Sequence, residues 1–196
     1  MTAYEPMHLY LQGLVDGELG RLMVALHEAR AINTYEVLGD YIKHWTWPKH
    51  ITAPSAKRLF SPEAAKANRK SSSFSCGANE LLSLIPVLGH YFLVLTHRAK
   101  LQHIKCFLAL LDVAQLVFAV GERHVDPDML EQLISRHLKL YVEVYGETSV
   151  LPKRNYCLML PEQLRTFGVI RRAFVHERHH MTLNKLMSSE LSLMDD

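Results

Sequence analysis

The segment FVHERHHM contains His176, Glu177 and His180 in the spacing H-E-x-x-H. On a helix this spacing places two imidazoles one turn apart, where both can bind zinc while the glutamate activates a water molecule. A zinc peptidase needs a third protein ligand as well. The extended motif would have Gly and His at two downstream positions, and this chain has Leu183 and Leu186 there. Zinc hydrolysis is therefore the weaker functional interpretation.

Glu177 is the only acidic residue in residues 163–189. Steps of three and four lead from Phe167 through Ile170 and Phe174 to Glu177, so on one continuous helix the carboxylate would share their apolar, core-facing side. A carboxylate in that position needs a cation, a metal or a proton. Two interpretations stay open: an ion pair with an arginine of another helix, or a functional metal ligand. The surrounding stretch is basic, with Arg165, Arg171, Arg172, Arg178 and Lys185.

Length and composition bound the class of protein. The chain has 196 residues, a formal charge of +2 and three cysteines without a CxxC pair. This is typical of one domain with reduced thiols, and the N-terminus lacks a secretory signal pattern. The most apolar stretch, residues 81–95, is interrupted by Pro86 and is shorter than the roughly 20 residues that span a bilayer. We expect an intracellular protein, nuclear or cytoplasmic, with no membrane partner and no small-molecule substrate.

Apolar spacing predicts an all-α fold. Residues 1–44 are expected to form the N-terminal helices, residues 76–187 a helical core with a final helix, and residues 188–196 a flexible tail. In the first helix, Pro6 suits the first turn, and apolar residues recur at helical spacing: Met7, Leu11, Leu14, Leu22 and Leu26. No segment shows the alternation of a β-strand.

Three consecutive helices are expected to build the core, from residues 81–95, 105–120 and 129–145. The third has its own start signal, with Asp126 as N-cap and Pro127 in the first turn, and Gly146 is expected to end it. Its apolar stripe is Met129, Leu130, Leu133, Ile134, His137, Leu138, Tyr141 and Tyr145.

Residues 45–75 lack helical periodicity and are rich in proline and serine, which predicts a long loop. This loop is basic, with a single acid, Glu63, against Lys49, Lys57, Arg58, Lys66, Arg69 and Lys70. It is either a solvated loop or an arm that contacts phosphates.

An ordered series of motifs runs from residue 5 to residue 185. In chain order they are YEPMHLYLQGLVDGEL, FSCGANELLSLIPVLGHYF, LLDVAQLVFA, VLPKRNYCLMLPEQLRTFG, and the triplet Glu177-Arg178-His179. This series resembles the C-terminal part of the catalytic region of eukaryotic CACTA (En/Spm)-type DDE transposases and their relatives.

The resemblance implies a multi-helix domain similar to the helical insertion and final helix of an RNase H-like transposase, without the β-core. It gives Glu177 the role of the last carboxylate of a Mg²⁺-binding triad and puts Glu5 where the family has aspartate. The first carboxylate of the family has no counterpart in this sequence. We therefore expect a transposase-derived remnant that is inactive alone, although the family catalyses Mg²⁺-dependent DNA strand transfer. Mg²⁺ would bind only in a completed site, and no cofactor is expected for this chain by itself.

The implied partners are DNA and other transposase subunits. The candidate DNA contacts are basic residues of the final helix and the loop: Arg165, Arg171, Arg172, Arg178, Lys185, Lys57 and Arg58. Arg171, Arg178 and Lys185 repeat every seven residues and would share one helix face. The alternative is a helical protein-interaction module that does not bind nucleic acid.

Overall fold

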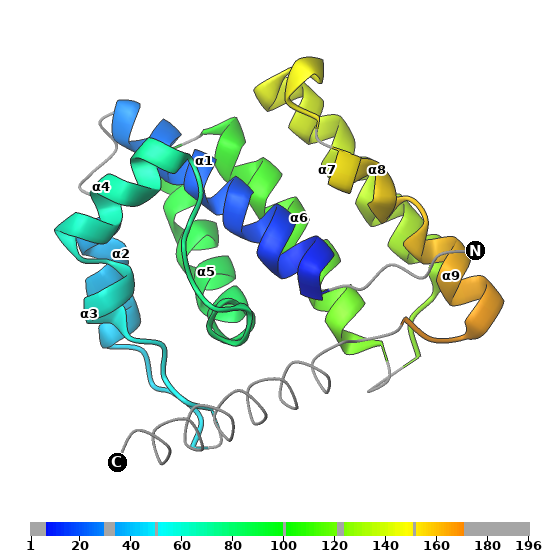
Figure 1. Cartoon of the computed structure of the whole chain (residues 1–196), viewed down its shortest axis with the longest axis horizontal. Coiled ribbons are helices and arrows are strands. Elements are labelled where there is room, and N and C mark those ends of the chain that lie inside the picture. Colours follow the sequence, from blue (N-terminus) through cyan, green and yellow to red (C-terminus); the bar gives the residue numbers. More distant parts are fainter. Residues whose placement is uncertain are drawn as a thin grey trace, which may run out of the picture.

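The computed structural model describes residues 7–29, 34–49, 51–99, 101–120, 124–150 and 152–170. In these ranges the protein consists of helices without a β-strand, which confirms the all-α prediction (Figure 1). The elements in chain order are η1 (Met7–Val15), α1 (Asp16–Glu28), α2 (Thr34–Lys43), α3 (Ala56–Leu59), α4 (Pro62–Ser71), α5 (Ala78–Ala99), α6 (Gln102–Ala119), α7 (Pro127–Tyr145), η2 (Glu147–Ser149), α8 (Pro152–Cys157) and α9 (Leu160–Phe167).

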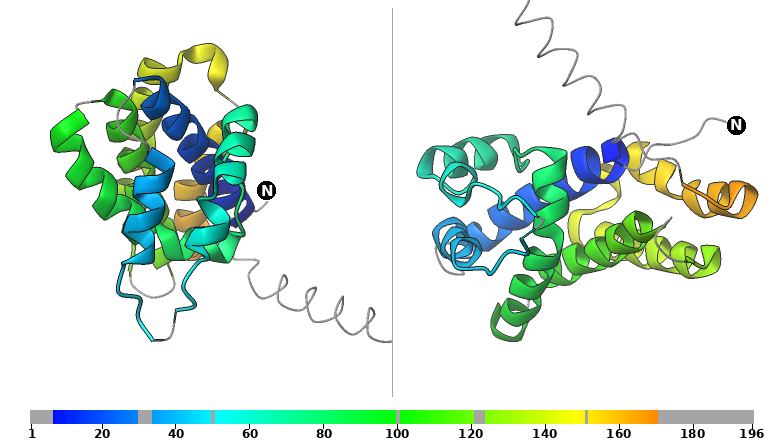
Figure 2. Two further views of the ribbon diagram at one scale, coloured as in Figure 1. Left: turned by 90° about the vertical axis from the view of Figure 1, so that its left-hand side faces the viewer. Right: turned by 90° about the horizontal axis from the view of Figure 1, so that it is seen from below.

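The N-terminal stretch η1–α1 runs through the middle of the molecule (Figures 1 and 2). The π-helical η1 is kinked at Gln12 and packs against α5, α6 and α8, whereas α1 packs against α2, α4 and α6. Leu11, Leu14, Leu22 and Leu26, predicted to lie on one apolar face, are all buried. This stretch therefore forms the centre of the core, which the sequence prediction had assigned to the three later helices alone.

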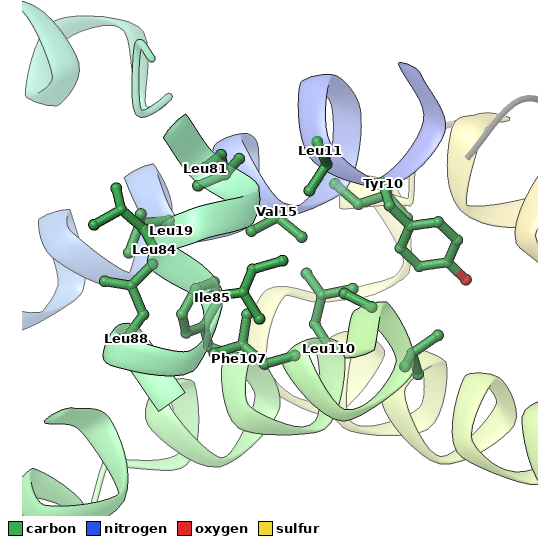
Figure 3. Packing of buried hydrophobic residues seen from close by; sticks show 14 of the residues in the cluster. Tyr10, Leu11, Val15, Leu19, Leu81, Leu84, Ile85, Leu88, Phe107 and Leu110 are labelled. Carbon is green, nitrogen blue, oxygen red and sulfur yellow. The ribbon is translucent and has the colours of Figure 1, made fainter. Parts of the chain in front are cut away.

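Those three helices do contribute to the core, as predicted. Figure 3 shows Val15 and Leu19 of the central stretch facing Ile85 of α5 and Phe107 of α6. Among the described helices, α6 is long and apolar enough to cross a membrane by composition, but its apolar side chains pack against α1, α5 and α7. The predicted stripe was wrong at Met129, which is 52% exposed. In the first turn of α7 it is the next residue, Leu130, that faces the core.

The prediction of a loop over residues 45–75 was wrong in its second half, where α3 and α4 form. Ser55 accepts a hydrogen bond from the backbone N–H of Arg58, and Ser61 accepts one from the N–H of Ala64. Pro62 occupies the first turn of α4. The serines and the proline that suggested a loop act here as helix-start residues, because they satisfy or replace unpaired N–H groups.

The continuous helix expected to carry Phe167 and Glu177 on one face is interrupted. α9 ends at Phe167, and Gly168 adopts a left-handed conformation with φ of 66°. Phe167 is 54% exposed and not core-facing, although Ile170 is buried. Pro161 lies in the first turn of α9. Glu177 itself lies outside the described residues.

A glycine permits the contact between α1 and the segment after α4. A Cβ added to Gly20 would lie 2.4 Å from the Cα of Ser73, which is backbone and has little freedom to move away. Beside it, the N–H of Phe74 donates a hydrogen bond to the carbonyl of Asp16 at 2.9 Å. The two backbones therefore approach closely only because position 20 has no side chain.

We expect Gly20→Ala to lower the free energy of unfolding by about 1–3 kcal/mol, the usual cost of forcing extra atoms into a packed contact. Gly17→Ala on the same helix is the matched control, because a Cβ there meets nothing within 4 Å. The control should raise stability by roughly 0.5–1 kcal/mol through helix propensity. Urea unfolding measures both, and equal effects of the two substitutions would contradict the close contact.

Candidate functional site

The described part of the chain contains a carboxylate without solvent exposure, Glu18 of α1. Its Oε1 accepts a hydrogen bond from the thiol of Cys106 at 3.2 Å. Its Oε2 lies 3.0 Å from Nε2 of His137 and accepts a second bond, also 3.0 Å, from Nη1 of Arg154. Because an ionised carboxylate only accepts, His137 must carry its proton on Nε2 in this arrangement. We call these four side chains the Glu18 cluster.

A second layer of polar and aromatic groups surrounds the Glu18 cluster. The guanidinium carbon of Arg154 lies 3.3 Å from the centroid of the Tyr141 ring, a cation–π contact. The Tyr141 hydroxyl accepts a hydrogen bond from Nη1 of Arg21 at 2.6 Å. The ring of Tyr145 lies tilted against that of Tyr141, with centroids 4.7 Å apart. The buried charges are thus surrounded by aromatic faces and a further cation.

Four helices position the cluster. Glu18 comes from α1, Cys106 from α6, His137 from α7 and Arg154 from α8. On α7, His137 and Tyr141 lie four residues apart and face α1 together. The site is therefore a junction at which three elements supply hydrogen-bond donors to one residue of the central helix.

The cluster holds Glu18 in its charged form. Burial raises the pKa of Glu18, but the hydrogen bond and charge of His137 and the charge of Arg154 outweigh it, so the net pKa is lowered. The opposite holds for Cys106: burial and then the neighbouring Glu18 carboxylate raise the pKa of the thiol far above its usual value. The cluster is therefore a buried carboxylate held by an imidazole and a guanidinium, beside a neutral thiol.

The donor atoms of the Glu18 cluster agree only in part with those of a metal site. Glu18, Cys106 and His137 offer oxygen, sulfur and nitrogen atoms within 4.8 Å of one another, which suits zinc by ligand type. Zinc needs the thiolate, however, and this environment favours the thiol. Arg154 already neutralises the charge of Glu18. A divalent ion bound to Glu18 and to a Cys106 thiolate would therefore leave net positive charge in a buried site. We interpret the cluster as a structural centre.

Most residues that the sequence marked for function lie outside the described part of the chain. They are Glu5, Arg171, Arg172, His176, Glu177, Arg178, His180 and Lys185. Their predicted roles as Mg²⁺ ligands, zinc ligands or DNA contacts stay predictions.

Three of the predicted DNA contacts are described. Arg165 donates hydrogen bonds to Asp128 and Glu131 of α7 and lies 3.6 Å from Glu162. Arg58 donates to both oxygens of Glu80. Lys57 is exposed and has no ion pair among the described residues.

The Glu18 cluster was missed by the sequence analysis, although one signal was present. Leu14, Glu18 and Leu22 follow at steps of four on an apolar stripe, the same pattern that was used to argue for Glu177. His137 was correctly placed on the apolar face of α7, and it is buried.

Comparison with protein families, curated protein sequences and solved structures finds no match for this chain. The transposase resemblance therefore depends on the ordered motifs alone.

We expect acid to destabilise the fold through Glu18. Because its folded pKa is lowered, its stabilising contribution is complete above the unfolded value of 4.5 and is lost as the pH falls through the folded value. The free energy of unfolding, measured by urea titration at a series of pH values, should fall below about pH 4.5. Glu18→Gln should flatten this dependence, whereas Glu143→Gln on the exposed face of α7 should preserve it.

We expect Arg154→Met to lower the free energy of unfolding by about 3–5 kcal/mol, because it leaves a buried charge without its cation. Glu18→Leu combined with Arg154→Met should cost clearly less than the sum of the two single substitutions. Additive losses in this double-mutant cycle would show that the two side chains do not stabilise each other.

Proposed function

We propose that this chain is a transposase-derived, DNA-associated helical domain whose described DNA-contacting surface lies on α3 and α4. The observation that carries the proposal is a group of exposed, unpaired lysines on two successive helices, α3 and α4. Lys57, Lys66 and Lys70 are exposed, and no acidic side chain in the described ranges pairs with them. Arg58 and Arg165, by contrast, are held in ion pairs. Exposed, unpaired ammonium groups are the ones available to neutralise phosphates.

The geometry of α4 supports this assignment. Lys66 and Lys70 lie four residues apart, so they share one face of the helix. Arg69 lies between them in sequence, and its guanidinium carbon is 5.9 Å from the Tyr35 ring centroid, which orients it toward α2. The lysines of α4 therefore form a short exposed row, whereas Arg69 connects α4 to α2 through its contact with Tyr35.

The transposase origin depends on the ordered motifs. Two of the segments that carry the resemblance are in contact: Glu18 belongs to YEPMHLYLQGLVDGEL and Arg154 to VLPKRNYCLMLPEQLRTFG, and these two side chains form a buried ion pair. No catalytic step is assigned to the chain, and any role of Mg²⁺, Glu5 or Glu177 belongs to the proposed ancestry.

A second candidate function is a helical protein-interaction module. It is favoured by apolar side chains that α8, α9 and the residues beside them leave exposed: Tyr156, Leu158, Met159, Phe167 and Val169. Exposed apolar side chains gathered in one region are typical of a protein interface. This apolar surface lies around α8 and α9, and the exposed lysines lie on α3 and α4. One function therefore does not exclude the other.

We expect the purified chain to bind duplex DNA with an affinity that falls steeply with salt. Each neutralised phosphate contributes about 0.9 to the slope of log affinity against log salt, so Lys66→Ala with Lys70→Ala should lower that slope by roughly two. Arg165→Met is the matched control and should leave the slope unchanged, because three carboxylates already surround this guanidinium. Fluorescence anisotropy of a labelled duplex at several salt concentrations measures all three.

The outcomes separate the candidates. If Arg171→Ala with Arg178→Ala lowers the salt slope and Lys66→Ala with Lys70→Ala does not, the DNA contacts lie around residues 171–178 and not on α4. If the wild-type chain fails to bind DNA even at low salt, the interaction module remains as the function.

A further inference from the structure

A pocket of about 550 Å³ lies between α2 and α3. This volume is within the range of sites that hold small organic groups. Its lining combines an aromatic surface, carboxylates and ammonium groups, contributed by Trp47, Phe60, Glu36, Asp40, Lys43 and Lys57.

The wall of the pocket depends on a close approach between α2 and Phe60. A Cβ on Gly39 would lie 2.7 Å from the Cβ of Phe60, so only glycine lets this side chain sit against the helix. The Phe60 ring is also held between the rings of Tyr35 and Phe74, with centroids 6.4 and 5.3 Å away. Trp47 packs on the core and keeps part of its surface open at the pocket. The pocket thus has a supported aromatic wall and a tryptophan available for stacking.

The pocket is lined by both cationic and anionic side chains. Residues 41–62 contain no acidic residue, and within the described part Lys43 and Lys57 are exposed without an ion pair. Asp40 is exposed on α2, and its carboxylate likewise has no ion pair in the described ranges. The pocket therefore offers two ammonium groups for an anionic group and the Asp40 carboxylate for a hydrogen-bond donor, beside a second carboxylate, Glu36.

A nucleotide is a ligand class that uses the tryptophan, the Asp40 carboxylate and the lysines together. Its base can stack on Trp47, its exocyclic amino group can donate to Asp40, and its phosphate can meet Lys43 and Lys57. An organic amine would leave the lysines without a partner, and inorganic phosphate would use neither the tryptophan nor the carboxylate. A base inside a duplex is stacked and paired, so only an unpaired base can enter such a pocket.

We infer that this pocket receives one unpaired base of single-stranded DNA, with a preference for cytosine over thymine. The preference follows from Asp40, because cytosine presents an N4 amino donor where thymine presents the O4 acceptor. The inference rests on the proposed association with DNA and adds the form of DNA that is bound and the side chains that hold it.

The test uses the two tryptophans of the chain as separate reporters. In Trp45→Phe the remaining emission comes from Trp47, and in Trp47→Phe it comes from Trp45, which packs against Tyr41 and His90 and does not line the pocket. Short oligodeoxycytidylate and oligodeoxythymidylate are titrated into both variants at low salt. We expect quenching by stacking in Trp45→Phe alone, with tighter binding of the cytidylate.

Two further variants test the assigned contacts. Trp47→Ala should weaken binding of the cytidylate by roughly tenfold, the scale of one lost base–aromatic stack. Asp40→Asn should reduce the preference for cytosine while retaining the quenching, because the tryptophan remains. Circular dichroism confirms that each variant is folded, and the conservative Trp→Phe pair keeps the test decisive if Trp47→Ala does not fold.

The outcomes distinguish this inference from the proposed function. Binding of duplex and single strands through Lys66 and Lys70 without a change in Trp47 emission would overturn the pocket and leave the proposed function intact. Absence of binding to any DNA would overturn both. Tighter binding of oligoribocytidylate than of the DNA strand, with the same quenching, would overturn the choice of DNA.

Discussion

A carboxylate without access to water lies on the central helix, and the arrangement of the surrounding helices depends on it. Glu18 has two oxygens to satisfy, and donors reach them from α6, α7 and α8. Moving any of these helices by the length of a side chain would leave a buried charge unpaired, at a cost of several kcal/mol. An apolar residue at this position would tolerate many packings. The charge tolerates fewer, because Glu18 has to remain within reach of its donors.

At the surface, ion pairs likewise connect elements that are separate in the sequence. Arg165 links α9 to the first turns of α7, and Arg58 links α3 to α5. These arginines can each reach two carboxylate oxygens through their planar guanidinium groups, which lysine cannot do with the same geometry. Among the described residues, the exposed cations of α2, α3 and α4 include Lys43, Lys57, Lys66 and Lys70.

The helices lie on two sides of the central stretch. Figures 1 and 2 show α2, α3 and α4 on one side of the central stretch, and α7, α8 and α9 on the other. The second side holds the buried network and closely packed helices. The first side approaches the central helix through Gly20 and carries the unpaired lysines and the pocket.

The sequence alone determined features that depend on neighbours within a few residues. Helical spacing located the central stretch and the three core helices, Asp126 and Gly146 marked the ends of α7, and His137 was placed on a buried face. Capping was underestimated in one segment, where Ser55 and Ser61 begin helices within a predicted loop. These outcomes follow from hydrogen bonds and side-chain directions that repeat along a single element.

Only the tertiary structure decided which charges meet. Glu18 has the same spacing signal as Glu177, but its partners lie 88 to 136 residues away, and no local pattern selects Arg154 from the other cations of the chain. Whether an arginine is paired, as Arg165 is, or a lysine is exposed, as Lys66 is, likewise depends on elements distant in sequence. The physical reason is that burial and charge pairing depend on the whole packed arrangement, whereas helix formation depends mainly on the nearest turns.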